Sequence, residues 1–210
     1  IIGTVASIIS FVFWPSLDAP DYLANISVNE NKVIIAAFFE LIMAVAVAGI
    51  PIMIYPILKK HNEGLALAHV GARLIEGVIY IVDAISLLTL LTLSQKFVKA
   101  GAPNDSYFQT SGTLLVAVSD WGFSVFATIV FAISALIFNH LLYQSKLIPR
   151  FIPVWGIIGA ILVFSTGLLA LYGNGLLILW IPIAVQEMVL AVWLIVKGFN
   201  SSAAIASGSA

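Results

Sequence analysis

The sequence predicts an all-α polytopic membrane protein with six transmembrane helices in one bundle. Of its 210 residues, 61% are hydrophobic and only 9% are charged, and its mean hydropathy is +1.11. Soluble domains are about 45–50% apolar and about 25% charged. A soluble domain of this size exposes too much surface to hide so many apolar side chains, so the lipid bilayer is the solvent that fits this composition.

Six apolar stretches are interpreted as spans, because a transmembrane helix needs about 20 mostly apolar residues. The first is short, and we expect it to be a truncated helix because the sequence opens inside its apolar run. The predicted spans cover residues 1–14, 33–58, 65–92, 115–143, 151–172 and 176–197.

Turn and proline residues set the limits of several spans. Residues 59–64 (KKHNEG) predict a tight turn between the second and third spans. Pro149 and Pro153 mark the start of the fifth span, where the missing backbone N–H of proline matters least. Pro182 lies one or two turns inside the sixth span, and we expect it to bend that helix.

Two longer polar connections, residues 15–32 and 93–114, are expected to hold short helices at the membrane interface. One six-helix domain is expected over residues 1–200. The small and polar residues 201–210 predict a disordered tail after this domain.

The cationic residues near the span ends predict the orientation of the bundle. One side carries Lys32, Lys96 and Lys99, and the other side carries five cations. The five-cation side is expected to be cytoplasmic, which places both termini inside. Its cations are Lys59, Lys60, Lys146, Arg150 and Lys197.

Net charge and cysteine content exclude several functions. The formal net charge is −1, from nine Lys and Arg against ten Asp and Glu, so no basic surface exists for nucleic acid. The absence of Cys excludes disulfides, thiolate metal sites and thiol redox chemistry.

The ionisable residues inside the spans are the informative ones. Each charge at a helix centre costs about 2.5–3.5 kcal/mol on insertion scales, so such residues face a bundle interior or a cavity. The third span carries three of them and is expected to lie inside the bundle. The residues are Glu40, Arg73, Glu76, Asp83, Asp120 and Glu187.

One face of the third span gathers its polar side chains. Arg73 and Glu76 are three residues apart, which allows them to pair along the helix. At 100° per residue, the polar positions fall within about an 80° stripe. They are His69, Arg73, Glu76, Tyr80 and Asp83.

We predict two polar groups from the depths of these residues. An inner group combines Arg73, Glu76 and Glu187, with Gln186 beside it, and an outer group combines Glu40, Asp83 and Asp120. Five carboxylates cannot all be ionised beside one Arg in a dry interior. Either some of them are protonated, or the groups line a wet cavity as in transporters and proton relays. The alternative is an ion-pair network that only fixes helix packing.

Two histidines suggest a cofactor site, which we disfavour. His69 and His140 lie at similar depth on different helices, so they could ligate a haem, or join carboxylates around zinc. However, no His-Glu-x-x-His motif occurs, and a His at a span end is more often an interfacial polar residue. We predict no cofactor and no metal.

Several separated motifs occur in order along the chain. They are YPILKKHNE at 55–63, RLIE at 73–76, SDW at 119–121, LLYQSKLIPR at 141–150, QE at 186–187 and WLIVKGF at 193–199. Together they resemble the domain-of-unknown-function 4386 family of small prokaryotic membrane proteins, over nearly the whole chain. The resemblance implies a topology and a prokaryotic plasma membrane, but no activity. It also implies motif positions for Arg73, Glu76, Asp120 and Glu187. His69 stands where an aromatic residue is usual, which weakens the haem and zinc alternatives.

The leading hypothesis is transport or binding of a small ligand, ion or proton through the intramembrane charges. Arg73 would hold an anionic group or counter the charges of Glu76 and Glu187, while the outer carboxylates would admit a proton or cation. The predicted network is Arg73, Glu76, Tyr80, Asp83, Gln186, Glu187, Glu40 and Asp120.

Two other functions stay open. The chain could be a structural or accessory subunit whose polar groups only fix helix packing. It could also be a membrane-embedded enzyme acting on a lipid or quinone, with Glu76 or Glu187 as general acid–base. The expected partners are the lipid bilayer and a small ligand, with a second copy of the chain or a membrane-complex subunit as open alternatives.

Overall fold

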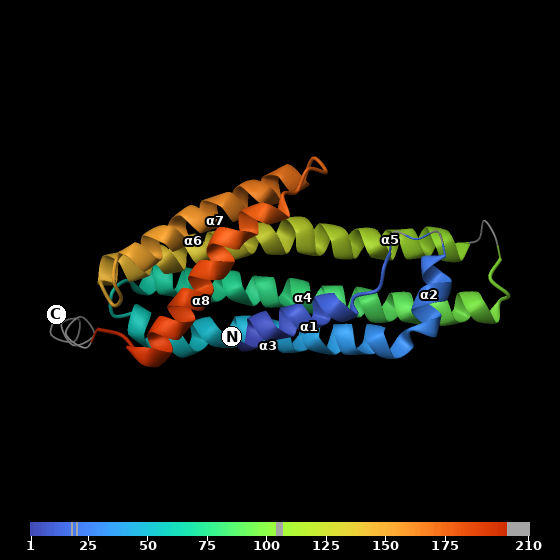
Figure 1. The fold of residues 1–210 in the computed structure, drawn as a ribbon, viewed down its shortest axis with the longest axis horizontal. Helices are drawn as coiled ribbons and strands as arrows, with labels where there is room; N and C mark the ends of the chain where they lie inside the picture. Colours follow the sequence, from blue (N-terminus) through green and yellow to red (C-terminus); the bar gives the residue numbers. More distant parts are fainter. Residues whose placement is uncertain (18, 20, 104–106, 201–210) are drawn as a thin grey trace. The chain divides into compact units, whose positions relative to one another are not determined.

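The computed structural model is helical throughout its regular elements, and it describes residues 1–17, 19, 21–103 and 107–200. Within these residues there is no strand, which confirms the all-α prediction. The helices are α1 (Ile2–Phe13), α2 (Tyr22–Val28), α3 (Glu30–Leu58), α4 (Glu63–Lys99), α5 (Tyr107–Trp121), the π-helical η1 (Gly122–Ala127), α6 (Thr128–Ser145), α7 (Phe151–Ala170), the 3-10 turn η2 (Leu177–Trp180) and α8 (Ile181–Val196) (Figure 1).

Five helical stretches are long and apolar enough to cross a membrane. They correspond to the second through sixth predicted spans. The first predicted span corresponds to α1, which has only 12 residues. At about 1.5 Å per residue it is shorter than a hydrocarbon core of about 30 Å, so the count of six spans is not confirmed. The five stretches are Glu30–Leu58, Glu63–Lys99, Tyr107–Ser145, Phe151–Ala170 and Leu177–Val196.

The two outer connections differ from each other. The first contains a short helix, α2, whose place at the membrane interface stays a prediction. In the second, α4 continues to Lys99 and α5 already begins at Tyr107, so the described residues hold no separate interfacial helix. The reason is packing, because Phe97 of α4 and Phe108 of α5 meet edge to face at 5.9 Å and extend both helices. The predicted tail at 201–210 lies outside the described residues.

Local chemistry explains the turns around α4 and α7. The tight turn is confirmed, and the Asn62 side chain accepts the Leu65 N–H at 3.0 Å to cap α4. The prolines at the start of α7 also lie as predicted. Pro182 lies in the first turn of α8, directly after the 3-10 turn η2, where its missing backbone N–H matters least. The bend at Pro182 stays a prediction.

The described chain forms two compact units, whose boundaries fall within α3, α4 and η1. The first, called the α1 unit, comprises the described residues of Ile2–Ala46 and Gly77–Phe123. The second, called the α8 unit, comprises Ile1, Val47–Glu76 and the described residues from Ser124 onward.

The α1 unit buries apolar side chains between α2, α3, α4 and α5. The Ser94 hydroxyl of α4 donates to the Leu23 carbonyl of α2. In the same unit α1 lies along α3, where Ser10 donates to the Ala36 carbonyl at 3.2 Å (Figure 1). Its core residues are Leu23, Ile26, Val33, Ala36, Ala37, Ala84, Leu87, Leu90, Leu91, Phe97 and Phe108.

In the α8 unit, α7 packs against both α6 and α8. Glycines permit the close approach. A Cβ at Gly159 would lie 2.9 Å from the Ile183 Cβ, and one at Gly167 would lie 2.7 Å from the Ile129 side chain. Small residues at these crossings let apolar helices pack without a hydrophobic drive from water.

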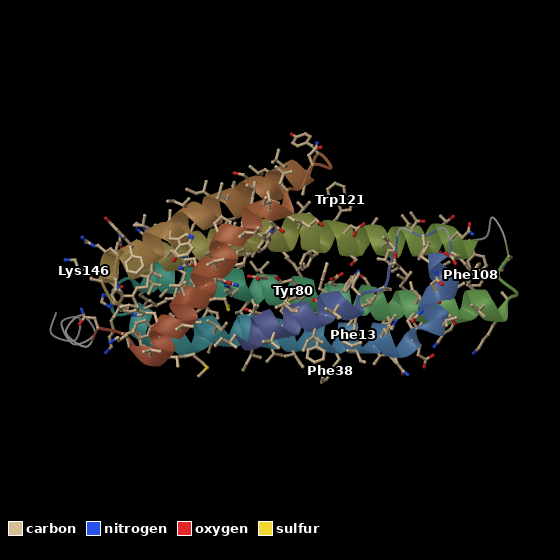
Figure 2. All side chains as sticks on the ribbon, in the orientation of Figure 1. Phe13, Phe38, Tyr80, Phe108, Trp121 and Lys146 are labelled. Atoms are coloured by element: carbon tan, nitrogen blue, oxygen red, sulfur yellow. The ribbon has the colours of Figure 1, made fainter. Side chains whose placement is uncertain are left out.

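Many large apolar side chains point outward from both units (Figure 2). Phe38 of α3 is 58% exposed and Trp121 at the end of α5 is 48% exposed. Because soluble monomers seldom expose so much contiguous apolar surface, this outer surface suits lipid.

Candidate functional site

Arg73 is the centre of the polar site in the α8 unit. It lies on α4, and its Nη1 donates to Glu76 Oε2 at 3.2 Å and to Oε1 at 3.4 Å. The spacing of three residues along one helix brings the two side chains together. The Glu76 side chain is 1% exposed, so this ion pair is buried.

Glu187 of α8 is the second acid beside Arg73. Its Oε1 lies 3.7 Å from Arg73 Nη2, which is longer than an ordinary hydrogen bond. Its side chain is 38% exposed, against 12% for Arg73. Glu187 therefore lies farther from Arg73 than Glu76 does, and its side chain is more exposed at the protein surface.

An aromatic pair supports the guanidinium. The Arg73 Cζ lies 4.9 Å from the ring centroid of Phe131 on α6, within the range of a cation–π contact. Phe131 in turn packs on Trp180, with ring centroids 5.1 Å apart. The sequence offered no signal for Phe131, since an aromatic residue in an apolar span is ordinary.

His69 faces α6, one turn of α4 before Arg73. It is buried, its Nδ1 lies 2.8 Å from the Ser134 hydroxyl, and its ring stacks on Phe138 at 4.9 Å. Its Nε2 has no hydrogen-bond partner among the described residues. His140 is exposed on α6, so the structure does not bring the two histidines together as a ligand pair.

Gln186 belongs to a different cluster from the one predicted. It is buried, and its amide donates to Asn139 Oδ1 at 3.2 Å and to the Ile152 carbonyl at 3.3 Å. Asn139 donates to the Ala135 carbonyl at 2.9 Å. These bonds connect α6, α7 and α8, so the grouping of Gln186 with Arg73 is corrected. Asn139, a lone amide in an apolar span, was the available signal.

The α1 unit holds the other buried acids. Glu40 of α3 is 4% exposed, and its Oε1 accepts a hydrogen bond of 2.9 Å from Ser10. Its Oε2 has no hydrogen-bond partner among the described residues. Asp83 of α4 is also buried and accepts from the Ser119 hydroxyl of α5. Sequence reasoning missed both serines, because serine is common in transmembrane helices.

Two further predicted residues lie in this unit. Asp120 is exposed at the end of α5, next to Ser119, whose hydroxyl donates to Asp83. Tyr80 is buried, and its ring lies 6.2 Å from that of Phe123.

The polar stripe predicted on α4 is largely buried. His69, Glu76, Tyr80 and Asp83 are all buried, and the Arg73 side chain is nearly so. Among the described residues, no three His, Cys, Asp or Glu side chains are placed to hold a metal ion.

Apolar helices that could span a bilayer, with ionisable groups buried between them, define a membrane-embedded helical protein. The chain belongs to the family described as "Domain of unknown function (DUF4386)", whose model matches residues 1–198. This confirms the resemblance noted in the sequence. Comparisons with curated proteins and with solved structures find no match.

Proposed function

We propose that this protein binds or transports a small ion together with a proton. In this proposal Glu187 takes up the proton and Arg73 binds the ion. The proposal rests on one observation: two acids lie beside one guanidinium at different distances and with different exposure. Glu76 is buried at 3.2 Å from Arg73, whereas Glu187 lies at 3.7 Å and is 38% exposed.

The charges of these three groups favour exchange at Glu187. One guanidinium and two ionised carboxylates sum to −1, and an excess charge within a membrane span is unfavourable. Glu76 already supplies a close counter-charge to Arg73. A proton taken up by Glu187 would neutralise the excess and release this acid from Arg73. The guanidinium could then accept a small anion in its place.

Glu40 and Asp83 extend the proposal to the α1 unit. Their hydrogen-bond partners are the hydroxyls of Ser10 and Ser119, which can serve a protonated or an ionised acid. Buried acids with adaptable partners are typical of proton relays in membrane proteins. We assign the uptake of a proton or cation to these two carboxylates.

Proton movement into reconstituted vesicles tests the proposal. The purified chain is placed in liposomes that enclose a pH-sensitive dye, and a potassium gradient with valinomycin drives proton entry. Wild-type vesicles should acidify faster than empty ones, and Glu187→Gln should reduce the excess rate by about tenfold or more. Adding phosphate or sulfate to the bath then shows whether an anion moves with the proton.

Glu63→Gln is the matched control. Glu63 is an exposed acid at the first residue of α4, so its neutralisation should leave the flux unchanged. The proposal is wrong if Glu187→Gln folds normally and keeps the wild-type flux, or if wild-type and empty vesicles acidify alike both with and without the added anions.

A packing role is the second candidate, favoured by the cluster of Asn139 and Gln186. Their hydrogen bonds connect three helices and need no ligand. If Arg73 and Glu187 also serve only packing, Glu187→Gln would change the melting temperature while no vesicle preparation conducts protons. The same two measurements therefore separate the candidates.

A further inference from the structure

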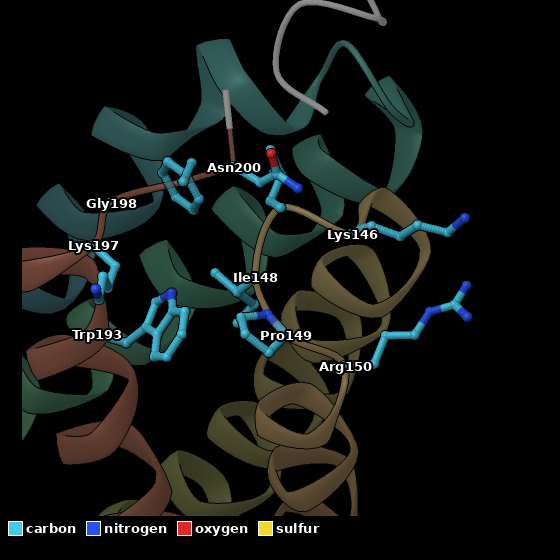
Figure 3. Close-up of a pocket in the computed structure, with 10 residues that line it drawn as sticks. Lys146, Ile148, Pro149, Arg150, Trp193, Lys197, Gly198 and Asn200 are labelled. Carbon is cyan, nitrogen blue, oxygen red and sulfur yellow. The ribbon is translucent and has the colours of Figure 1, made fainter. Parts of the chain in front are cut away.

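A second polar feature lies at one end of the α8 unit and contains none of the acids discussed above. The chain turns from α6 into α7 at Lys146–Arg150, and the segment after α8 runs beside this turn (Figure 3). The Asn200 N–H donates to the Leu147 carbonyl at 2.8 Å and joins the two. A cavity of about 550 Å³ is lined by residues 146–150 together with Trp193 and residues 197–200.

The charged residues that line this cavity are all cationic. Its lining includes Lys146, Arg150 and Lys197 and contains no acidic residue. Among the described residues, no carboxylate forms an ion pair with any of the three cations. Arg150 instead lies over the Tyr143 ring at 4.9 Å. In Figure 3, Lys146 and Arg150 extend from one side of the turn, and Lys197 lies near Trp193 on the other. Such a lining attracts an anion.

The surroundings favour an anion that carries an apolar tail. The cavity lies at the ends of apolar helices, and Trp193 lines it, as tryptophan does at the headgroup level of bilayers. Exposed apolar side chains continue from its rim along both helices, with Phe151 on α7 61% exposed and Ile195 on α8 70% exposed. An acyl chain could lie on these side chains while its headgroup occupies the cavity.

We propose that this cavity binds the phosphate-bearing headgroup of an anionic phospholipid. The long cationic side chains, of which Lys146 and Arg150 extend outward from the turn in Figure 3, would turn toward the cavity to contact the phosphate. The side chains of α7 and α8 would contact the acyl chains. Basic pockets near the ends of transmembrane helices recognise anionic headgroups by the same chemistry. The proposal rests on the apolar helices and the cavity, and it does not depend on proton transport.

Lipid binding to the purified full chain tests the proposal. Native mass spectrometry in mild detergent would compare phosphatidylglycerol with phosphatidylcholine of the same acyl chains. We expect phosphatidylglycerol to bind about tenfold or more tightly. Arg150→Gln/Lys197→Gln should weaken it about 25-fold, since each cation contributes roughly fivefold. Lys146 stays unchanged in this variant because its backbone has a left-handed φ of 54°.

The matched control is Lys59→Gln/Lys60→Gln, which removes two exposed cations from another turn of the same unit. This variant should bind phosphatidylglycerol like the wild type. Equal affinity for the two lipids would overturn the proposal, and so would an equal loss in the control. Competition by inorganic phosphate as strong as that by the lipid would assign the cavity to free phosphate instead.

A measurement on the wild type keeps the proposal testable if the double variant does not fold. Phosphatidylglycerol with a photoreactive headgroup is crosslinked to the protein, and the modified peptides are mapped. Labels within 146–150 and 193–200 are expected. Labelling spread over all the connections would contradict a specific site.

Discussion

The α8 unit and the α1 unit bury carboxylates in different ways. Glu76 faces the guanidinium of Arg73, whereas Glu40 and Asp83 have hydroxyl partners. A carboxylate paired with a buried cation cannot lose its charge without leaving the cation uncompensated. A carboxylate held by a neutral hydroxyl can be neutralised while keeping its hydrogen bond. The difference predicts that charge removal is costly at Glu76 and mild at Glu40 and Asp83.

The largest effect is expected from Arg73→Met. This change leaves Glu76 and Glu187 without their shared cation and should lower the free energy of unfolding by about 3–5 kcal/mol. Unfolding in mild detergent, followed by circular dichroism, measures the loss. Lys60→Met, at an exposed position, is the control. An unchanged stability of Arg73→Met would remove the basis of the comparison.

A direct contrast between the units comes from two isosteric changes. Glu76→Gln removes the closer acid from Arg73 and should cost about 2–4 kcal/mol. Glu40→Gln keeps an acceptor for Ser10, so it should change stability by less than about 1 kcal/mol. The same unfolding measurement compares them. Equal losses would mean that Glu40 also depends on its charge.

Glycine replacements compare the packing of the units. A Cβ at Gly156 would clash with the Asn139 amide, which hydrogen bonds hold in place, and should cost about 1–3 kcal/mol. A Cβ at Gly112 would meet the end of the Tyr22 side chain, whose hydroxyl has no hydrogen-bond partner among the described residues. Gly112→Ala should therefore cost less than Gly156→Ala in melting experiments. The opposite order would show that Tyr22 is the more rigid neighbour.

A small effect is also expected from Ser10→Ala in the α1 unit. It removes the hydroxyl donor of Glu40 and should cost about 1 kcal/mol. Ser165→Ala is a suitable control, because Ser165 is partly exposed and donates to the Ile161 carbonyl of its own helix. If both variants melt alike, the hydrogen bond from Ser10 adds nothing to stability.

Much of the fold follows from the sequence because its main determinant is apolar length. Five helical stretches, the tight turn at 59–62 and the start of α7 follow from apolar runs, a capping Asn and prolines. The ends of α4 and α5 do not, because Phe97 and Phe108 extend both helices by a contact between residues distant in sequence. The division into two units has no compositional boundary, since it falls inside continuous helices.

The candidate site was less predictable. The periodicity of α4 indicates which of its polar residues share a face, and the pairing of Arg73 with Glu76 follows from their spacing. Periodicity within one helix cannot say which residue of another helix lies opposite. Gln186 is adjacent to Glu187 in sequence but bonds to Asn139, because neighbouring residues on a helix point about 100° apart.

We propose above all that Glu76 holds Arg73 in place, while Glu187 binds Arg73 when ionised and leaves it when protonated. Double-mutant cycles measure this directly, combining Arg73→Met with Glu76→Gln and, separately, with Glu187→Gln in unfolding experiments. The account predicts a coupling energy of about 2 kcal/mol or more between Arg73 and Glu76, and of less than about 1 kcal/mol between Arg73 and Glu187. A stronger coupling of Arg73 to Glu187 than to Glu76 would contradict it.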